Sequence, residues 1–224
     1  MIGATPPCAD DNANYAHVAA HRKRKGETRP EILGPAVLAL YKDYMSCLVA
    51  AGGPEPNGAF TESDQQILKG NADYLTLANF ASLRGAILSA GPAKKCPYCY
   101  QLAASQVDHY LPKAHFGEYA IYAPNLVPIC GRCNGKKLNR YKRPEGGRRY
   151  LHPYFDRLPT GSTPFVTATL SVGASITIAF NIVKVPGISD EIWNILRSQF
   201  ADLDLGTRYM EEAIETMMSM RFSQ

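Results

Sequence analysis

Two pairs of cysteines constrain the fold of this chain more than any other feature of its sequence. Both pairs have the spacing C-x-x-C, and 30 residues separate them. A tight turn with two residues between its cysteines directs both thiolates at one ion, and two such turns complete a closed tetrahedral zinc site. We therefore predict one structural Zn²⁺ bound by Cys96, Cys99, Cys130 and Cys133.

Other uses of these cysteines fit the sequence less well. A redox C-x-x-C needs a single motif in a thioredoxin-like βαβ context. The chain starts without a basic segment leading into an apolar one, so we expect no secretory signal and a reducing cytoplasm, where disulfides are disfavoured. Cys8 and Cys47 have no partner at a ligand spacing, and we expect ordinary roles for them. A closed four-cysteine site cannot itself activate water, so its expected role is to fix the chain between the two pairs.

The composition is that of a folded protein. The chain has 224 residues, of which 46% are hydrophobic and 20% charged, so it is able to bury a core and wholesale disorder is excluded. No apolar run approaches the roughly 18–20 residues that a membrane span requires, and we expect no membrane partner.

The segment between the cysteine pairs carries the residues of interest. Val107 begins a short strand-like stretch that Pro112 ends, and residues 124–130 form a second one. The residues after Cys133 are typical of a helix start. The expected order is strand, long loop, strand and helix, with Asp108, His109, Asn125 and Asn134 as the polar residues along it.

This arrangement resembles the HNH endonucleases, the nucleases with a ββα-metal (His-Me finger) fold. The match is dense over residues 96–137: Asp-His, then Asn, then Cys-x-x-Cys-Asn-x-x-Lys, within paired C-x-x-C knuckles. The resemblance implies that His109 is the general base and that Asp108 and Asn134 bind a catalytic metal. It also implies that Asn125 braces the loop that orients the histidine.

The chemistry of these residues agrees with that resemblance. An imidazole with an ordinary pKa of about 6.5 is suited to deprotonating water near neutral pH. One carboxylate and one amide oxygen, completed by waters and phosphate oxygens, suit Mg²⁺ or Mn²⁺. Successive side chains of a regular strand point to opposite faces, so Asp108 and His109 serve one phosphate only if the chain bends there. We expect His115, in the same loop, to be polar surface.

Basic residues are concentrated beside this segment. Eight of the 24 Lys and Arg residues lie between positions 131 and 149, against the single acid Glu145. Such a cluster favours contact with nucleic-acid phosphates, and salt-sensitive, sequence-independent binding. The residues that we assign to this contact are Lys136, Lys137, Arg140, Lys142, Arg143, Arg148 and Arg149. A second run, residues 22–25, is more typical of a solvated face.

The flanking sequence indicates an α+β protein with four parts. Residues 1–29 are polar and predict an irregular arm, and apolar residues at helical spacing predict a helical region over 30–92. The zinc-braced ββα-metal module occupies 93–145. In 146–224, two alternating segments split by Gly173-Ala174-Ser175 predict a β-hairpin. Two helices follow it, at about 190–203 and 206–221, the second with a methionine-rich stripe.

The C-terminal part also resembles a narrower group. Residues 94–215, including Leu151-His152-Pro153-Tyr154-Phe155-Asp156, are similar to the PtuB-type HNH nucleases of ATPase-associated antiphage systems, Septu and the retron-linked pairs. That resemblance implies an ATPase partner and makes His152 and Asp156 candidates for supporting the site. A capped turn after the zinc module explains the same two residues equally well.

The function predicted from the sequence is metal-dependent hydrolysis of phosphodiester bonds in nucleic acid, with DNA as the expected substrate. Two alternatives remain open at this point. One is a non-catalytic zinc-ribbon module that binds nucleic acid or protein, and the other is a toxin-like RNase that uses the same site.

Overall fold

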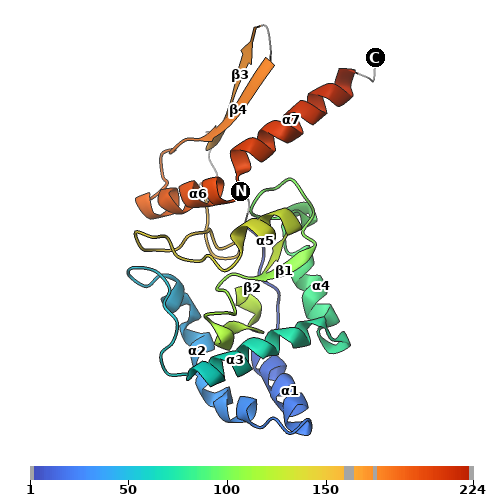
Figure 1. Cartoon of the computed structure of the whole chain (residues 1–224), viewed down its shortest axis with the longest axis vertical. Helices are drawn as coiled ribbons and strands as arrows, with labels where there is room; N and C mark the ends of the chain where they lie inside the picture. The colour runs from blue at the N-terminus through green and yellow to red at the C-terminus, as the bar shows by residue number, and fades with distance from the viewer. Residues whose placement is uncertain (1–2, 159–163, 174–175, 222–224) are drawn as a thin grey trace. The chain divides into compact units, whose positions relative to one another are not determined.

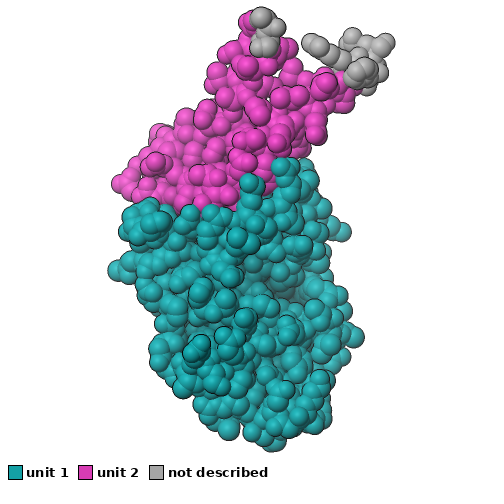
Figure 2. All heavy atoms as spheres, in the orientation of Figure 1, with its two compact units in different colours: residues 1–156 teal, residues 157–224 magenta. Residues whose placement is uncertain are grey.

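The computed structural model describes residues 3–158, 164–173 and 176–221. The chain divides into two compact units, Met1–Asp156 and Arg157–Gln224, which Figure 2 colours separately. The α+β class predicted from the sequence is confirmed (Figure 1). No helix in the described part of the chain combines the length and the apolar character that crossing a membrane demands.

Unit 1 consists of helices around a small sheet. Its α-helices are α1 (Asp11–Arg24), α2 (Arg29–Leu48), α3 (Glu62–Lys69), α4 (Ala81–Ser89) and α5 (Gly131–Lys137). Its strands are β1 (Gln106–His109) and β2 (Leu126–Ile129). Short 3₁₀ turns lie at η1 (Gly70–Thr76), η2 (Ala78–Phe80), η3 (Pro92–Lys94), η4 (Gly117–Tyr119) and η5 (Ala123–Asn125).

Several helices begin where a polar side chain supplies a missing hydrogen bond. The Asp10 carboxylate accepts from the backbone N–H of Ala13 at 2.9 Å at the start of α1. Thr61 and Asp64 form a reciprocal capping box at the start of α3. These contacts satisfy backbone N–H groups that have no partner within the first helical turn, so they fix the helix starts locally.

The two strands of unit 1 place the candidate site. β1 and β2 pair antiparallel, with Asp108 opposite Val127 and His109 opposite Leu126. β2 is buried along its whole length, and α4 packs against both strands. β1 remains partly exposed, so the Asp-His pair lies on the accessible strand.

The irregular arm predicted for residues 1–29 is wrong, because most of this segment forms α1. Tyr15 and Val18 of α1 are buried against α2, and the Tyr15 hydroxyl donates to the carbonyl of Pro30 at 2.8 Å. Alanines and charged residues fill the rest of the helix, so its apolar stripe is too narrow to stand out in the sequence.

We predicted that residues 22–25 form a solvated face, and this is wrong for Arg22. Arg22 is buried and donates to the carbonyl of Ile67 at 2.6 Å and to the side-chain oxygen of Asn71 at 2.7 Å. Asn71 is itself buried in η1, the segment that separates α3 from α4. Arg22 thus satisfies one backbone carbonyl near the end of α3 and one side-chain oxygen in η1, and it holds α1 against both segments.

Residues 146–156 belong to unit 1, although we assigned them to the C-terminal part. The Tyr110 hydroxyl donates to the carbonyl of Tyr150 at 2.6 Å, and the Tyr154 hydroxyl donates to the carbonyl of Leu126 at 2.7 Å. All four residues are buried. These contacts attach the segment to the sheet, so Gly146 and Gly147, where we placed the start of the C-terminal part, form a turn inside unit 1 and not a boundary.

Unit 2 contains the predicted hairpin and both predicted helices. β3 (Val166–Val172) pairs antiparallel with β4 (Ile176–Ile182), and α6 (Asp190–Asp202) and α7 (Leu205–Arg221) follow. The side chain of Ser189 accepts from the N–H of Ile192 at 3.2 Å and caps α6. Of the expected turn, Ala174 and Ser175 lie outside the described residues.

Candidate functional site

The four cysteines predicted to bind zinc form one buried cluster in unit 1. Their Sγ atoms all lie within 4.8 Å of one another. The Sγ atoms of Cys99 and Cys130 are 3.7 Å apart. Ligands about 2.3 Å from a tetrahedral zinc are about 3.8 Å from one another, so the cluster has the dimensions of a zinc site.

The backbone turns around the cysteines are those of metal-binding knuckles. The N–H of Tyr100 donates to the carbonyl of Cys96 at 2.8 Å, with Tyr100 in the left-handed region at φ 60°. The second knuckle leads directly into α5, where the Cys130 Sγ accepts from the N–H of Cys133 at 3.5 Å. The knuckles thus join the segment before β1 to the start of α5.

The thiols influence one another strongly at this distance. Hydrogen bonds, first from Cys130 and then from Cys133, hold the pKa of Cys99 far below its usual range. Hydrogen bonds with Cys130 and Cys96 raise the pKa of Cys133 well above it. Such a cluster shares thiolate charge among its members, and a tetrahedral all-sulfur site of this kind fits a structural Zn²⁺.

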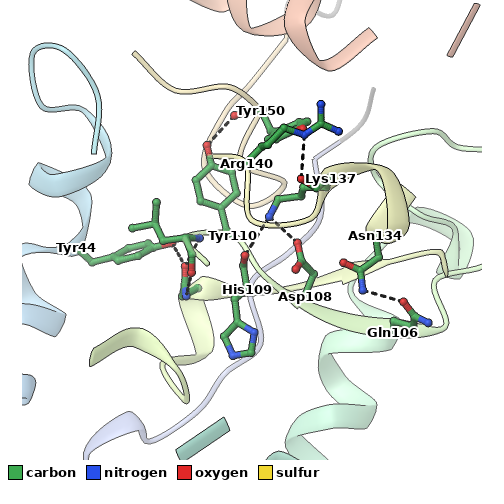
Figure 3. Close-up of polar contacts among 11 residues, drawn as sticks. Tyr44, Gln106, Asp108, His109, Tyr110, Asn134, Lys137, Arg140 and Tyr150 are labelled. Carbon is green, nitrogen blue, oxygen red and sulfur yellow. Dashed lines mark hydrogen bonds and ion pairs between the residues drawn. The ribbon is translucent and has the colours of Figure 1, made fainter. Parts of the chain in front are cut away.

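A groove of about 500 Å³ runs along β1 and α5 beside the cysteine cluster. Asp108, His109 and Asn134 line it, together with Gln106 and Lys113. Figure 3 shows that the side chains of Asp108 and His109 leave β1 in different directions, as expected for consecutive strand residues. Both nevertheless border the groove, because β1 ends at His109 and the chain turns there.

His109 is held in one tautomer by a backbone carbonyl. Its Nε2 lies 2.8 Å from the oxygen of Ala120, and because a carbonyl only accepts, Nε2 carries the hydrogen. The lone pair of the neutral ring therefore resides on Nδ1. Burial lowers the pKa of His109 to about 4, so the ring is neutral at physiological pH.

Asp108 forms an ion pair with a lysine that the sequence did not place there. Its Oδ2 lies 2.9 Å from the Nζ of Lys137, which also donates to the carbonyl of His109 at 3.1 Å (Figure 3). The Lys137 side chain is only 1% exposed and that of Asp108 12%. Lys137 therefore attaches α5 to the end of β1 and fixes the Asp108 carboxylate.

Asn134 is oriented by Gln106, a residue that the sequence reasoning missed. The Asn134 amide nitrogen donates to the Gln106 Oε1 at 2.9 Å (Figure 3), so the Asn134 Oδ1 remains available as an oxygen ligand. Gln106 stands two residues before Asp108, and side chains two apart on a strand share a face. That spacing is the signal that could have identified it.

Asn125 is fully buried and joins both ends of the loop between the strands. Its amide nitrogen donates to the carbonyls of Leu111 and Tyr119, at 3.1 and 3.2 Å. Its side-chain oxygen accepts from the N–H of Leu111 at 2.8 Å and from the Tyr44 hydroxyl at 2.9 Å. Tyr44 lies on α2, and nothing in the local sequence indicates this contact.

His152 and Asp156 make structural contacts in unit 1. The Tyr44 hydroxyl lies 3.2 Å from the Nε2 of His152, which is fully buried. Burial lowers the pKa of His152 well below its usual value. Asp156 forms two hydrogen bonds with the Arg148 guanidinium, at 2.7 and 3.0 Å.

The basic cluster divides into buried and accessible members. Lys137 and Arg148 are buried in ion pairs, so their assignment to phosphate contact is wrong. Lys142 pairs with Glu55, and Arg143 pairs with Glu145 at 3.2 Å. Partial exposure is shared by the five remaining members, Lys136, Arg140, Lys142, Arg143 and Arg149, although the side chain of Arg143 is only 10% exposed.

Comparison with known proteins gives one distant relative. The chain is 28% identical over 128 residues to Protein ea31 of Escherichia phage lambda, a match that covers 57% of this chain. It covers 43% of that protein, so the chain spans less than half the length of its relative. No protein-family model and no solved structure matches the chain.

Proposed function

We propose that this protein is a metal-dependent endonuclease of the HNH type that hydrolyses phosphodiester bonds, with DNA as the substrate. One observation carries the proposal: a single groove is lined by His109, whose Nδ1 has a free lone pair, and by the two potential metal ligands Asp108 and Asn134. The distant likeness to a phage protein of unstated activity neither supports nor opposes it.

The residues of the groove divide the work of hydrolysis as follows. His109 takes a proton from water through Nδ1 while Nε2 stays bonded to Ala120. The water oxygen then bonds to phosphorus, and the bond from phosphorus to the leaving oxygen breaks, that oxygen taking a proton from solvent. Asp108 and Asn134 would hold Mg²⁺ or Mn²⁺, which makes a bound water more acidic and neutralises charge on the phosphate.

The test compares His109, at the end of β1, with a second histidine in the loop that follows. We expect His109→Ala to lower the cleavage rate about 10²- to 10⁴-fold with DNA binding and zinc content unchanged. The exposed His115, which is not among the groove residues, provides the matched control, and we expect His115→Ala to cleave normally. Supercoiled plasmid and structured RNA are each incubated with and without added Mg²⁺ or Mn²⁺, because removing the added ion leaves the buried zinc in place.

The outcomes separate the proposal from its two alternatives. Full cleavage by the His109→Ala protein would refute the mechanism. Binding of plasmid without cleavage under any added metal would favour a zinc-ribbon binding module. Cleavage of RNA with plasmid left intact would favour a toxin-like RNase.

We further propose, from the resemblance to PtuB-type nucleases, that the protein is the effector of an antiphage system and acts with an ATPase. Co-expression with the protein of the adjacent gene is expected to yield a complex that hydrolyses ATP. Separate elution of the two proteins at micromolar concentration would contradict this.

A further inference from the structure

The hairpin of unit 2 contains no charged residue. From Leu158 to Val183 the sequence has no Asp, Glu, Lys, Arg or His. Strands at the edge of a sheet usually carry charges, prolines or bulges that prevent pairing with another chain. β3, a strand of seven residues, has none of these, so its sequence permits such pairing.

The hairpin has one apolar and one polar face. The register places Ala168 opposite Phe180 and Leu170 opposite Ile178, on the same face as the Val172–Ile176 pair. Thr169 and Thr177 lie on the other face, with small or uncharged polar neighbours. A hairpin with this division needs a cover over its apolar face.

α7 covers only part of that face. It packs on β4, whose Ile178, Phe180 and Ile182 are partly buried. Figure 1 shows α7 and the hairpin diverging toward the turn of the hairpin. The apolar side chains left exposed are Leu170 (58%), Val172 (74%), Ile176 (42%), Ile214 (40%), Met217 (37%) and Met218 (58%).

The sequence of β3 is complementary to itself. When two copies pair antiparallel about Thr169, small or uncharged residues meet at every position and no like charges oppose one another. The pairs are Val166 with Val172, Thr167 with Ser171, Ala168 with Leu170, and Thr169 with its own copy. Threonine–threonine and threonine–serine pairs are favourable across strands.

We propose that the protein forms a symmetric dimer through β3, with the two hairpins joined into a four-stranded antiparallel sheet. The pairing satisfies the outer backbone groups of β3 and makes the apolar faces of the two hairpins continuous. Leu170 and Val172, which are exposed in one copy, then lie beside Ala168 and Val166 of the second copy. This inference is independent of the proposed nuclease activity.

The decisive variant changes a residue on the polar face. Thr169 is exposed and Thr169→Lys leaves the apolar face and α7 intact, yet places two lysines opposite each other at the centre of the dimer. Sedimentation equilibrium of the zinc-loaded full chain is expected to give twice the 24.6 kDa of one chain for the wild type. We expect the dissociation constant to rise roughly fivefold to tenfold in the variant.

A matched control and a rescue define the outcome. Thr177→Lys adds the same charge to the same face on β4, away from the dimer axis, and is expected to dimerise like the wild type. Mixing Thr169→Lys with Thr169→Glu protein is expected to restore dimers, because opposite charges then meet. A wild-type monomer up to about 100 µM would overturn the proposal, as would a dimer that Thr169→Lys leaves unaffected. If the wild type is monomeric, the outer edge of β3 is available to a strand of a different protein.

Discussion

Among single residues, Asp11 of α1 has an unusual environment for an acid. Its carboxylate accepts from the backbone N–H of Ala123 at 2.8 Å, so it connects the N-terminal helix to the turn that leads into Asn125. Burial raises the pKa of Asp11 from 3.8 to about 6, the hydrogen bond from Ala123 opposes that rise, and the charge of Asp10 adds to it. A contact that positions the candidate site thus includes a carboxyl that ionises near neutral pH.

The raised pKa makes this contact dependent on pH. The folded protein binds a proton that the unfolded chain releases, so the stabilisation is complete below about pH 4 and is lost as the pH rises through about 6. We expect Asp11→Asn, which keeps the acceptor for Ala123, to raise the free energy of unfolding by about 1–2 kcal/mol at about pH 8. The favourable effect of a charge at a helix N-terminus reduces the gain.

Urea denaturation at about pH 4 and about pH 8 measures this difference. At the lower pH we expect Asp11→Asn and wild type to agree, because Asp11 is protonated in the folded state. Asp10→Asn retains the exposed cap of α1 and removes only the smallest of the three effects on Asp11, so we expect it to give a smaller gain at about pH 8 than Asp11→Asn. An equal gain at both pH values would show that the charge of Asp11 is not the cause.

At the scale of elements, the second knuckle and α5 form one structural feature. Cys130 is both a predicted zinc ligand and the N-cap of α5, the helix that carries Asn134 and Lys137. Metal binding and helix position are therefore coupled at one residue. Loss of the ion would release the start of α5 and with it one side of the groove.

Cys130→Ser separates these two roles, because serine caps helices well and binds zinc poorly. We expect the variant to retain much less than one zinc per chain. Its melting temperature should fall by roughly 10 °C or more, because the binding free energy of a structural zinc contributes to folding. Metal analysis and thermal denaturation monitored by circular dichroism measure both effects.

Cys47 provides the comparison for this experiment, since it is a partly buried thiol outside the cluster. The Cys47→Ser protein is expected to keep its zinc. A stable Cys130→Ser protein without zinc would show that the two knuckles do not form one metal site.

For the molecule as a whole, we expect DNA binding to depend more on where the positive charges lie than on the net charge. The formal net charge is +4, and the partly exposed members of the basic cluster lie between positions 136 and 149. Phosphate contacts release counterions, so each one adds about 0.9 to the slope of log K against log salt on duplex DNA. The slope therefore counts contacts that the net charge does not reveal.

Two triple variants with the same change in net charge test this expectation. Lys136→Gln/Lys142→Gln/Arg149→Gln removes three positive charges from the partly exposed part of the basic cluster, and we expect it to reduce the slope by up to about 2.7. Lys23→Gln/Arg24→Gln/Lys25→Gln removes three at the end of α1 and is expected to leave the slope unchanged. Titrations of labelled duplex DNA at several salt concentrations measure both. Equal slopes in the two variants would reassign the basic cluster to contact with a protein partner.

The sequence by itself determined the features that depend on neighbouring residues. The spacing within each C-x-x-C pair indicated the four-cysteine cluster, because a knuckle is a local turn. Alternation over seven residues indicated β3 and β4, and Ser189 marked the start of α6. In each case the physical signal lies within a few residues, where side-chain period and backbone capping act.

Only the tertiary structure decided which polar residues are buried. Lys137 was expected to contact phosphate, but it pairs with Asp108, and Arg148 pairs with Asp156. Tyr44 and Asn125 form a hydrogen bond across 81 positions of sequence. A charged or polar side chain is buried where a distant segment supplies its partner, because the cost of desolvation is otherwise too high. That partner is fixed by the packing of whole elements, which no local pattern of residues records.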